Sequence, residues 1–246
     1  MEKTYSTSQI AALIGIHPNT VRLYEELRLI TEPERKPNGY RVFTDLHVEQ
    51  FRIARLAFEI EVIQNGLRKQ ALEIVRAVAA CDFERAATLT REYIAQLIRE
   101  EADAEKAVLI TEDLRQGAAA DTQELCLTRK ETADYLHVTI DTLRNWELNG
   151  LLSIKRKKNG YRVYTDPDIR RLTIIKSLRY ANFSLAAILR MLSVLDQEPE
   201  TDIRAVIDTP DRGEEIITAC DNLLTSLTKA KTNAQEMLDV LKQALA

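Results

Sequence analysis

Glycine, proline and aromatic residues are scarce in this sequence. The 246 residues include only 7 glycines and 6 prolines, and phenylalanine, tryptophan and tyrosine together make up 6%. Sandwiches and barrels of β-strands need many turn residues and strands rich in aromatic side chains, so this composition favours helices. The length is more than one typical domain needs and is comfortable for two.

An excess of positive charge is also missing, because the formal net charge is −4. Any footprint for nucleic acid must therefore be local, and the bulk charge argues neither for nor against one. The N-terminus lacks the apolar run of a signal peptide, and no apolar stretch reaches the length of a membrane span. We therefore expect a cytoplasmic protein without a membrane partner.

Cysteine is rare, and its positions do not suggest metal binding. Cys81, Cys126 and Cys220 are far apart, their number is odd, and no paired Cys or Cys/His spacing occurs. This pattern argues against a disulfide framework and predicts neither a metal site nor a cofactor.

The residues that enzymes use for chemistry are also few. The three histidines, His17, His47 and His137, accompany no nucleophile motif and no phosphate-binding loop. We therefore expect no catalytic residues and no enzymatic activity.

The sequence contains an internal repeat. Residues 20–25, TVRLYE, return as residues 142–147, TLRNWE, at an offset of 122. Residues 36–45, KPNGYRVFTD, return as residues 157–166, KKNGYRVYTD, at an offset of 121. Two copies at this distance indicate a duplicated domain and exclude a solenoid.

The first copy has the pattern of a winged helix-turn-helix. Ser6 or Thr7 can cap a short amphipathic helix, Gly15 interrupts it, and Pro18 stands in the first turn of a second helix. A hairpin around Asn38-Gly39 then follows directly, as a wing would.

The second copy repeats this pattern. Thr128 caps its first helix, Thr139 or Asp141 begins its second, and Asn159-Gly160 turns its wing.

A pair of helices is predicted after each wing. Thr44 and Thr165 are expected to cap the first helix of each pair, and in the second copy another helix restarts at Leu185 and runs to about Leu195. In the first copy the equivalent segment, residues 59–66, holds about four extra residues.

Each copy is expected to end in a long helix with a seam of apolar residues. In the first copy the seam comprises Thr90, Tyr93, Leu97, Ala104, Ala107 and Leu114, with Glu100 as an interruption. In the second copy it comprises Ile216, Cys220, Leu223, Leu227, Ala230, Ala234, Met237, Leu241 and Ala244. Steps of three and four over about four heptads indicate burial against another helix.

The linker between the copies suggests how these seams pair. Residues 116–124 reach at most about 30 Å when extended, whereas a parallel pairing would require a return along roughly 45 Å of helix. We therefore expect an antiparallel coiled coil within one chain, and a domain-swapped homodimer stays open as the alternative. The expected domains are a first winged helix-turn-helix domain at 1–80, a first long helix at 81–116, a linker at 117–125, a second such domain at 126–198, and a connector with the second long helix at 199–246.

Taken together, these motifs resemble the DNA-binding domain of MerR-type regulators. The residues that carry the resemblance are TVRLYE and NGYRVFTD in the first copy and TLRNWE and NGYRVYTD in the second. The resemblance implies a mainly α fold with two winged helix-turn-helix domains. It also implies a transcription regulator of double-stranded DNA that binds a pseudo-palindromic operator, bends or untwists the promoter, and so acts on RNA polymerase.

The candidate DNA-binding residues lie on the second helix and the wing of each copy, where side chains reach base edges and phosphates. In the first copy they are Pro18, Asn19, Thr20, Arg22, Tyr24, Arg35, Lys36, Tyr40 and Arg41. In the second copy they are Asp141, Thr142, Arg144, Asn145, Trp146, Lys155, Arg156, Lys157, Lys158, Tyr161 and Arg162. Other roles stay open: capping for Asn19, Thr20 and Thr142, a core role for Tyr24 and Trp146, and pairing with Glu25 or Glu147 for the helix arginines.

The two copies differ in local charge. Residues 139–165 carry six basic and two acidic side chains, whereas residues 18–44 carry five basic and four acidic ones. The second copy is therefore expected to supply more of the salt-dependent affinity for DNA. Because residues 18–20 read PNT and residues 140–142 read IDT, the two half-sites need not be identical.

Two other functions remain as alternatives. One is an architectural protein that remodels DNA without contacting polymerase. The other is a redox or ligand sensor that uses Cys81, which stands just ahead of the first long helix. An inert cysteine is the simpler interpretation of Cys81.

Overall fold

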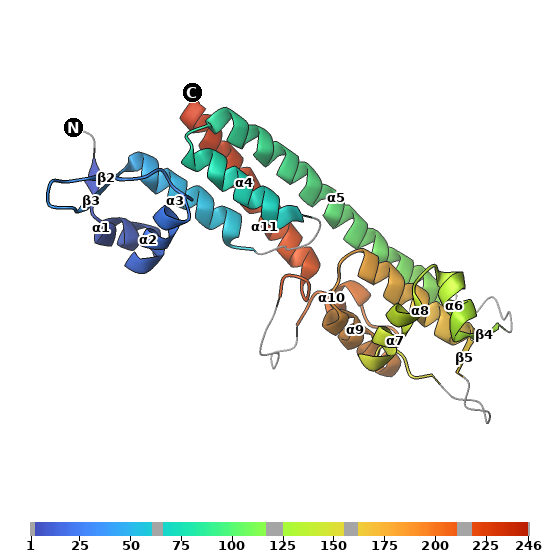
Figure 1. Cartoon of the computed structure of the whole chain (residues 1–246). Coiled ribbons are helices and arrows are strands. Elements are labelled where there is room, and N and C mark those ends of the chain that lie inside the picture. Colours follow the sequence, from blue (N-terminus) through green and yellow to red (C-terminus); the bar gives the residue numbers. More distant parts are fainter. Residues whose placement is uncertain (1–2, 61–65, 117–124, 155–161, 211–217, 246) are drawn as a thin grey trace. The chain divides into compact units, whose positions relative to one another are not determined.

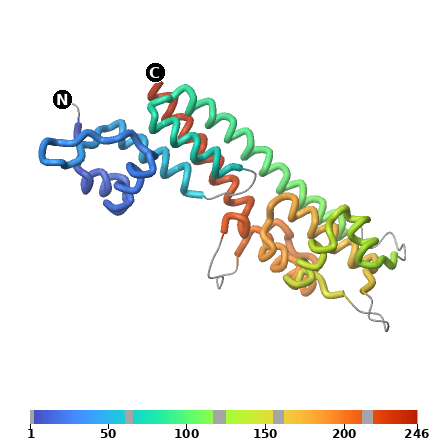
Figure 2. Tube along the Cα trace, viewed as in Figure 1, coloured from blue at the N-terminus to red at the C-terminus, as the bar shows by residue number. Residues whose placement is uncertain are grey.

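The protein is mainly helical in a computed structural model that describes residues 3–60, 66–116, 125–154, 162–210 and 218–245. The chain forms two compact units, which we describe separately. Unit 1 comprises residues 1–99 and 226–246, and unit 2 comprises residues 100–225. Figure 1 labels the elements, and Figure 2 traces the chain through them from the N- to the C-terminus. Among the described residues, no helix is long and apolar enough to cross a membrane.

The helix-turn-helix of unit 1 consists of α1 (Thr7–Ile14) and α2 (Pro18–Glu26). Ser6 caps α1 as predicted, in a reciprocal capping box with Gln9. Gly15 ends α1 with a φ of +73°, a left-handed conformation that glycine adopts at little cost. The tight turn between the two helices follows from these local signals.

The wing of unit 1 is the predicted hairpin. β2 (Glu34–Arg35) pairs with β3 (Arg41–Thr44), so that Arg35 lies opposite Arg41. Gly39 turns the hairpin with a φ of +83°, and its N–H donates to the carbonyl of Lys36. A further strand, β1 (Thr4–Tyr5), pairs antiparallel with β3 and completes a three-stranded sheet of order β1-β3-β2.

Three helices follow this wing: α3 (Asp45–Phe58), α4 (Leu67–Ala79) and α5 (Phe83–Gln116). Thr44 caps α3 as predicted, with His47 as the reciprocal partner of the capping box. The core of the module is apolar and gathers side chains from the helix-turn-helix, the wing and α3: Ile10, Ala11, Val21, Ile30, Phe43 and Phe51.

Helix α11 (Leu223–Leu245) belongs largely to unit 1 although it is last in the sequence. In Figure 2 its red trace returns among the helices of unit 1. Asn233 Nδ2 donates to Glu59 at 2.8 Å, Lys229 pairs with Glu59 at 2.8 Å, and Arg52 pairs with Glu236 at 2.7 Å. The hydrogen bonds from Lys229 and then Asn233 lower the pKa of Glu59. Polar contacts thus fasten α11 to α3 and to Glu59, the residue that follows it.

Unit 2 repeats the helix-turn-helix as α6 (Arg129–Leu136) and α7 (Ile140–Leu148). Thr128 and Thr139 cap the two helices, as predicted. β4 (Cys126–Thr128) pairs antiparallel with β5 (Val163–Thr165). The hairpin turn predicted at Asn159-Gly160 lies outside the described residues.

After β5 come α8 (Asp166–Tyr180), α9 (Leu185–Gln197) and α10 (Ile203–Ile207). Thr165 caps α8 and Ser184 caps α9, so the predicted helix restart at Leu185 is confirmed. Arg190 is buried and donates to the main-chain carbonyls of Ile207 and Asp221. This arginine ties the connector after α10 to α9.

The predicted seam of the second long helix is too long at its N-terminal end. The helix α11 begins at Leu223, so Cys220 lies in a turn before it, and Ile216 lies outside the described residues. The carboxylate of Asp208 accepts from the N–H groups of Leu224 and Thr225 at 2.8 and 3.0 Å. A carboxylate there caps the first turn and defines the start of the helix. From Leu223 to Leu241 every seam residue is buried, whereas Ala244 is exposed.

Candidate nucleic-acid interface

In unit 1 the second helix of the helix-turn-helix, α2, presents its predicted DNA-binding residues on its solvent face. His17 caps this helix by accepting from the N–H of Asn19, and Val21 is fully buried on the opposite face. Asn19 and Arg22 are exposed, while Pro18 and Thr20 are half-buried. Arg22 Nη1 donates to Asn19 Oδ1 at 2.8 Å, which holds the guanidinium along the helix. Arg22 therefore pairs with Asn19 and not with Glu25.

A glutamate on α2 holds the wing of unit 1 against the helix. Glu25 accepts from Arg35 at 2.9 Å and from the Nε of Arg41, and its side chain is only 11% exposed. Arg41, predicted as a phosphate ligand, therefore also works inside the module, with a side chain 22% exposed. This ion-pair cluster fixes the distance between α2 and the wing.

The tip of this wing projects into solvent. Lys36, Tyr40 and Arg35 are all exposed, and Tyr40 retains 72% of its accessible surface. The N–H of Lys36 donates to the carbonyl of Tyr40, which closes the loop. These side chains are accessible from solvent, and their part in DNA binding stays a prediction.

In unit 2, α7 is the counterpart of α2. Asp141, Arg144 and Asn145 are exposed, whereas Trp146 on the inner face is 5% exposed. Thr142 Oγ1 lies 2.8 Å from Thr139 Oγ1, so part of its hydrogen-bonding capacity serves the helix start. The exposed residues among these form the outward face of the helix.

Glu147 on α7 is the counterpart of Glu25 and accepts more hydrogen bonds. Arg129 Nη2 donates to both of its carboxylate oxygens at 2.9 and 2.7 Å, Arg162 Nε lies 3.1 Å away, and Tyr164 donates its hydroxyl. Burial raises the pKa of Tyr164, and a hydrogen bond with Tyr164 raises the pKa of Arg129. Both wing arginines, Arg41 and Arg162, are therefore anchored by a carboxylate of the helix next to the wing.

Arg129 was not predicted from the sequence as part of this cluster. Arg129 is the first residue of α6 and lies 18 positions from Glu147. An ion pair at this separation leaves no periodic signal in a sequence, unlike a pair on one helix. The sequence shows only that Arg129 follows the predicted cap Thr128, which does not indicate a pair with Glu147.

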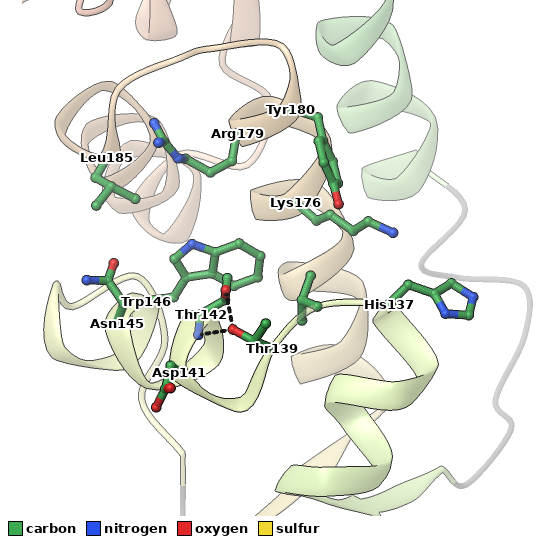
Figure 3. A pocket seen from close by; sticks show the side chains of 11 residues that line it. His137, Thr139, Asp141, Thr142, Asn145, Trp146, Lys176, Arg179, Tyr180 and Leu185 are labelled. Carbon is green, nitrogen blue, oxygen red and sulfur yellow. Dashed lines mark hydrogen bonds between the residues drawn. The ribbon is translucent and has the colours of Figure 1, made fainter.

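A cavity of about 730 Å³ separates the N-terminal end of α7 from α8 and the start of α9 in unit 2 (Figure 3). Lys176, Arg179 and Tyr180 of α8 line it opposite Thr139 and Thr142. The ammonium group of Lys176 lies 5.6 Å from the ring centroid of Tyr180. In Figure 3 the indole of Trp146 lies within this group, while His137 points away from it.

This cavity suits an anion such as a phosphate. Its walls bring Lys176 and Arg179 near the start of α7, where the positive end of the helix dipole attracts negative charge. The predicted site omitted Lys176, Arg179 and Tyr180, because they belong to α8 and not to the helix-turn-helix or the wing.

The aromatic residues of the two second helices pack inward. The ring of Tyr24 stacks on Phe51 with centroids 5.4 Å apart, and burial raises the pKa of Tyr24. Trp146 is buried at the equivalent position. Of the two roles left open for these residues, this packing supports the core role.

Five predicted wing residues of the second copy lie outside the described residues: Lys155, Arg156, Lys157, Lys158 and Tyr161. Their part in DNA binding stays a prediction. Cys81, the residue of the alternative sensor function, is exposed and has a φ of +58°, and its Sγ lies 3.5 Å from the hydroxyl of Thr31. Among the described residues, no group of three His, Cys, Asp or Glu side chains could hold a metal ion.

The chain builds twice a helix-turn-helix whose second helix is ion-paired to a wing strand. This arrangement places the protein among the winged helix-turn-helix proteins. Comparison with family models shows which family of winged helix-turn-helix proteins the two modules resemble. A model described as MerR family regulatory protein matches residues 6–43, and one described as MerR HTH family regulatory protein matches residues 127–195. The chain therefore carries two MerR-type modules in tandem.

Curated relatives agree with this assignment over part of their length. The chain is 38% identical over 53 residues to the HTH-type transcriptional regulator CueR of Yersinia pestis, a match that covers 22% of this chain and 38% of the relative. It is 37% identical over 73 residues to the HTH-type transcriptional regulator ZntR of Escherichia coli, covering 29% and 52%. It is 30% identical over 77 residues to a mercuric resistance operon regulatory protein of Bacillus cereus, covering 31% and 58%. The matches thus span only about half of these relatives, and no solved structure matches the chain significantly.

Proposed function

We propose that this protein is a sequence-specific regulator of transcription that binds double-stranded DNA with both modules of a single chain. One observation carries the proposal: the same exposed helix beside an anchored wing is built twice, with Arg22 and Arg144 at equivalent, exposed positions. Arginines on such a helix read guanine edges in the major groove and contact phosphates. The names of the curated relatives, which are transcriptional regulators, support the same function.

The two modules bind half-sites that differ in sequence. α2 begins with Pro18 and Asn19, whereas α7 begins with Ile140 and Asp141. The carboxylate of Asp141 only accepts hydrogen bonds and suits a cytosine amino group, whereas the amide of Asn19 both donates and accepts and suits an adenine edge. The operator is therefore an asymmetric pseudo-palindrome. A perfectly symmetric operator that binds more tightly than any asymmetric one would contradict this.

Phosphate contacts come from the wings and from the cationic cavity of unit 2. Arg41 and Arg162 serve at the wings, Lys36 and Tyr40 at the first wing tip, and the basic run 155–158 at the second. Removing one cationic side chain that binds a phosphate should reduce the slope of log affinity against log salt by about 0.9. Changing Lys157 and Lys158 to Gln together should therefore reduce this slope more than changing Lys36 to Gln.

The long helices α5 and α11 pair as an antiparallel coiled coil within one chain, so that a monomer does the work of a homodimer. The burial of the α11 seam from Leu223 to Leu241 and of Leu97 and Ala104 on α5 supports this arrangement. The short linker supports an intrachain pairing over a domain-swapped one. Light scattering should give the mass of one chain at micromolar concentration, and a dimer that persists on dilution would favour the swap.

The binding test starts from a random pool of duplex DNA, because the operator is unknown. Sequences selected by the protein are footprinted, and affinity is then measured by fluorescence anisotropy for Arg22→Gln, for Arg144→Gln and for Lys69→Gln. Lys69 is an exposed residue of α4 away from the proposed interface, so it serves as the matched control. Each arginine variant should lose about 5- to 150-fold in affinity and relax preference in one half-site only. Failure to select any sequence, or equal losses in the control, would refute the function.

The regulator acts by bending or untwisting promoter DNA for RNA polymerase. Energy transfer between dyes at the two ends of a selected site measures bending on binding, and transcription in vitro with purified polymerase measures its effect. Bending without any change in transcription would favour an architectural protein instead.

A further inference from the structure

The second helix of the helix-turn-helix in unit 2, α7, carries two large apolar side chains on its solvent face. Ile140 is 46% exposed, and Leu148 is 78% exposed, which is the largest exposed fraction of any large apolar side chain among the described residues. Ile140 stands four residues before Arg144 and Leu148 four residues after it, and Arg144 is exposed as well. Residues at this spacing share one face of a helix, so the arginine stands in an apolar row.

The corresponding positions of α2 in unit 1 do not carry this row. At the offset of 122 residues, Pro18 stands in place of Ile140 and Glu26 in place of Leu148. Pro18 is half-buried, and Glu26 is charged. Leu23, the exposed leucine of α2, follows the helix arginine directly and therefore lies about 100° around the helix from it. The apolar row beside the arginine thus distinguishes the second module from the first.

The surroundings of this row are positively charged. Leu148 lines a cleft of about 400 Å³ together with Arg129, Arg144, Arg162 and Glu147. Glu147 pairs with Arg129 and Arg162, yet three guanidinium groups against one carboxylate leave an excess of positive charge. The charge of this face therefore complements a polyanion, and the partner must also offer an apolar group to the row.

Duplex DNA offers such an apolar group in its major groove, the 5-methyl group of thymine. Ile140 is the first residue of α7, and the N-terminal residues of a helix of this kind face base edges. Its β-branched side chain has few rotamers, so it loses little entropy when a methyl group packs against it. One helical turn separates Ile140 from Arg144, about 6 Å along the axis, which matches about two base-pair steps of 3.4 Å.

We propose that Ile140 covers the 5-methyl group of a thymine in the half-site of unit 2, about two base pairs from the base pair that Arg144 reads. This inference rests on the proposed function, in which α7 enters the major groove. Packing of the methyl group against Ile140 removes water from both, so thymine is preferred over bases that carry only hydrogen at C5. Pro18 does not offer this side chain, so the half-site of unit 1 does not depend on a thymine methyl group at the equivalent position. Ile140 thereby determines specificity without a hydrogen bond.

The test removes this methyl group from the DNA and leaves the protein intact. Each thymine of a selected duplex is replaced in turn by deoxyuridine, and the affinity of the full-length protein is measured by fluorescence anisotropy. In the half-site whose preference Arg144→Gln relaxes, one replacement should weaken binding about fourfold, the effect of one buried methyl group. Ile140→Ala should bind the thymine and deoxyuridine duplexes equally. Leu109→Ala changes an exposed leucine of α5 in the same unit, so it is the matched control and should keep the fourfold difference.

The outcomes separate this inference from the proposed function. Failure to select any sequence would overturn both. A selected half-site of unit 2 in which no thymine is sensitive to replacement, or a fourfold loss that persists in Ile140→Ala, would overturn only the role of Ile140, because specific binding and its dependence on Arg144 would remain. If Ile140→Ala does not fold, the two half-sites of the wild-type complex decide: a loss confined to the half-site of unit 2 supports the inference, and equal losses at equivalent positions of both half-sites overturn it.

Discussion

The carboxylate of Glu147 should be the main polar support of the second module. Replacing it by Gln keeps the shape of the side chain but removes the charge that balances Arg129 and Arg162 and weakens acceptance from Tyr164. Breaking a fully buried ion pair costs about 3 to 5 kcal/mol, but these two arginine side chains are 25% and 33% exposed. We therefore expect Glu147→Gln to lower the free energy of unfolding of unit 2 by about 2 kcal/mol.

The single tryptophan of the chain makes this change measurable in one unit. Trp146 is 5% exposed and lies next to Glu147 in α7, so its fluorescence reports the unfolding of unit 2. With a urea dependence of about 2 kcal/mol per molar, a loss of about 2 kcal/mol shifts the midpoint by about 1 M. Glu200→Gln is the matched control, because Glu200 is an exposed residue of the same unit. A midpoint for Glu147→Gln equal to that of the control would refute the reasoning.

The first module offers an internal comparison for this prediction. Glu25 accepts from Arg35 and Arg41 but has no tyrosine donor, because Phe43 stands where the second copy has Tyr164. Tyr164→Phe should therefore cost unit 2 about 1.5 kcal/mol on its own, the value of a hydrogen bond to a charged group. A Tyr164→Phe midpoint equal to wild type would show that the tyrosine contributes nothing to the cluster.

Three further changes test other features. His137 has the left-handed backbone conformation that Gly15 has in the first copy. His137→Gly should therefore leave the stability of unit 2 unchanged or raise it by up to about 1 kcal/mol. A clear decrease in the urea midpoint would contradict this. Burial lowers the pKa of His47, so protons bind more readily to the unfolded chain and unit 1 loses stability as the pH falls below about 6.5. Hydrogen exchange of α3 between pH 7 and 5 should show this loss, and His47→Gln, which keeps the capping position, should abolish it. Burial opposes the ionisation of Asp221, but hydrogen bonds from Ser184 and Thr218 outweigh it and lower the pKa of Asp221. The stability that Asp221 adds to unit 2 is therefore full above about pH 4 and is lost at lower pH. In urea titrations, Asp221→Asn should destabilise unit 2 at about pH 7 and approach the wild-type midpoint near about pH 3.

The features that the sequence predicted well depend on neighbouring residues. Ser6, Thr128 and Thr139 begin helices because a side-chain oxygen meets an N–H two or three residues later, and Asn38-Gly39 turns a hairpin for an equally local reason. The duplication itself followed from matching residues at one offset. Interactions between neighbouring residues thus made most of each helix-turn-helix and the first wing predictable from the sequence.

The features that the sequence did not predict depend on distant partners. β1 is two residues long and exists because it pairs with β3, nearly forty residues later. The start of α11 is defined by Asp208, which precedes it by many residues, so the heptad pattern alone extended the helix too far. Lys176 and Arg179 reach the cavity of unit 2 only because α8 lies across it from the start of α7. Contacts between residues so far apart in the chain produce no regular residue spacing in the sequence.

The return of α11 to unit 1 has a consequence for synthesis on the ribosome. Residues 100–225 form unit 2 without interruption, whereas unit 1 needs residues 226–246 to provide the partners of Arg52 and Glu59. Unit 1, whose first residues are translated before those of unit 2, is therefore completed only after all of unit 2 has emerged from the ribosome. A nascent chain that stops before α11 exposes the apolar surface that α11 would cover, so premature termination near the C-terminus yields a defect at the opposite end of the sequence.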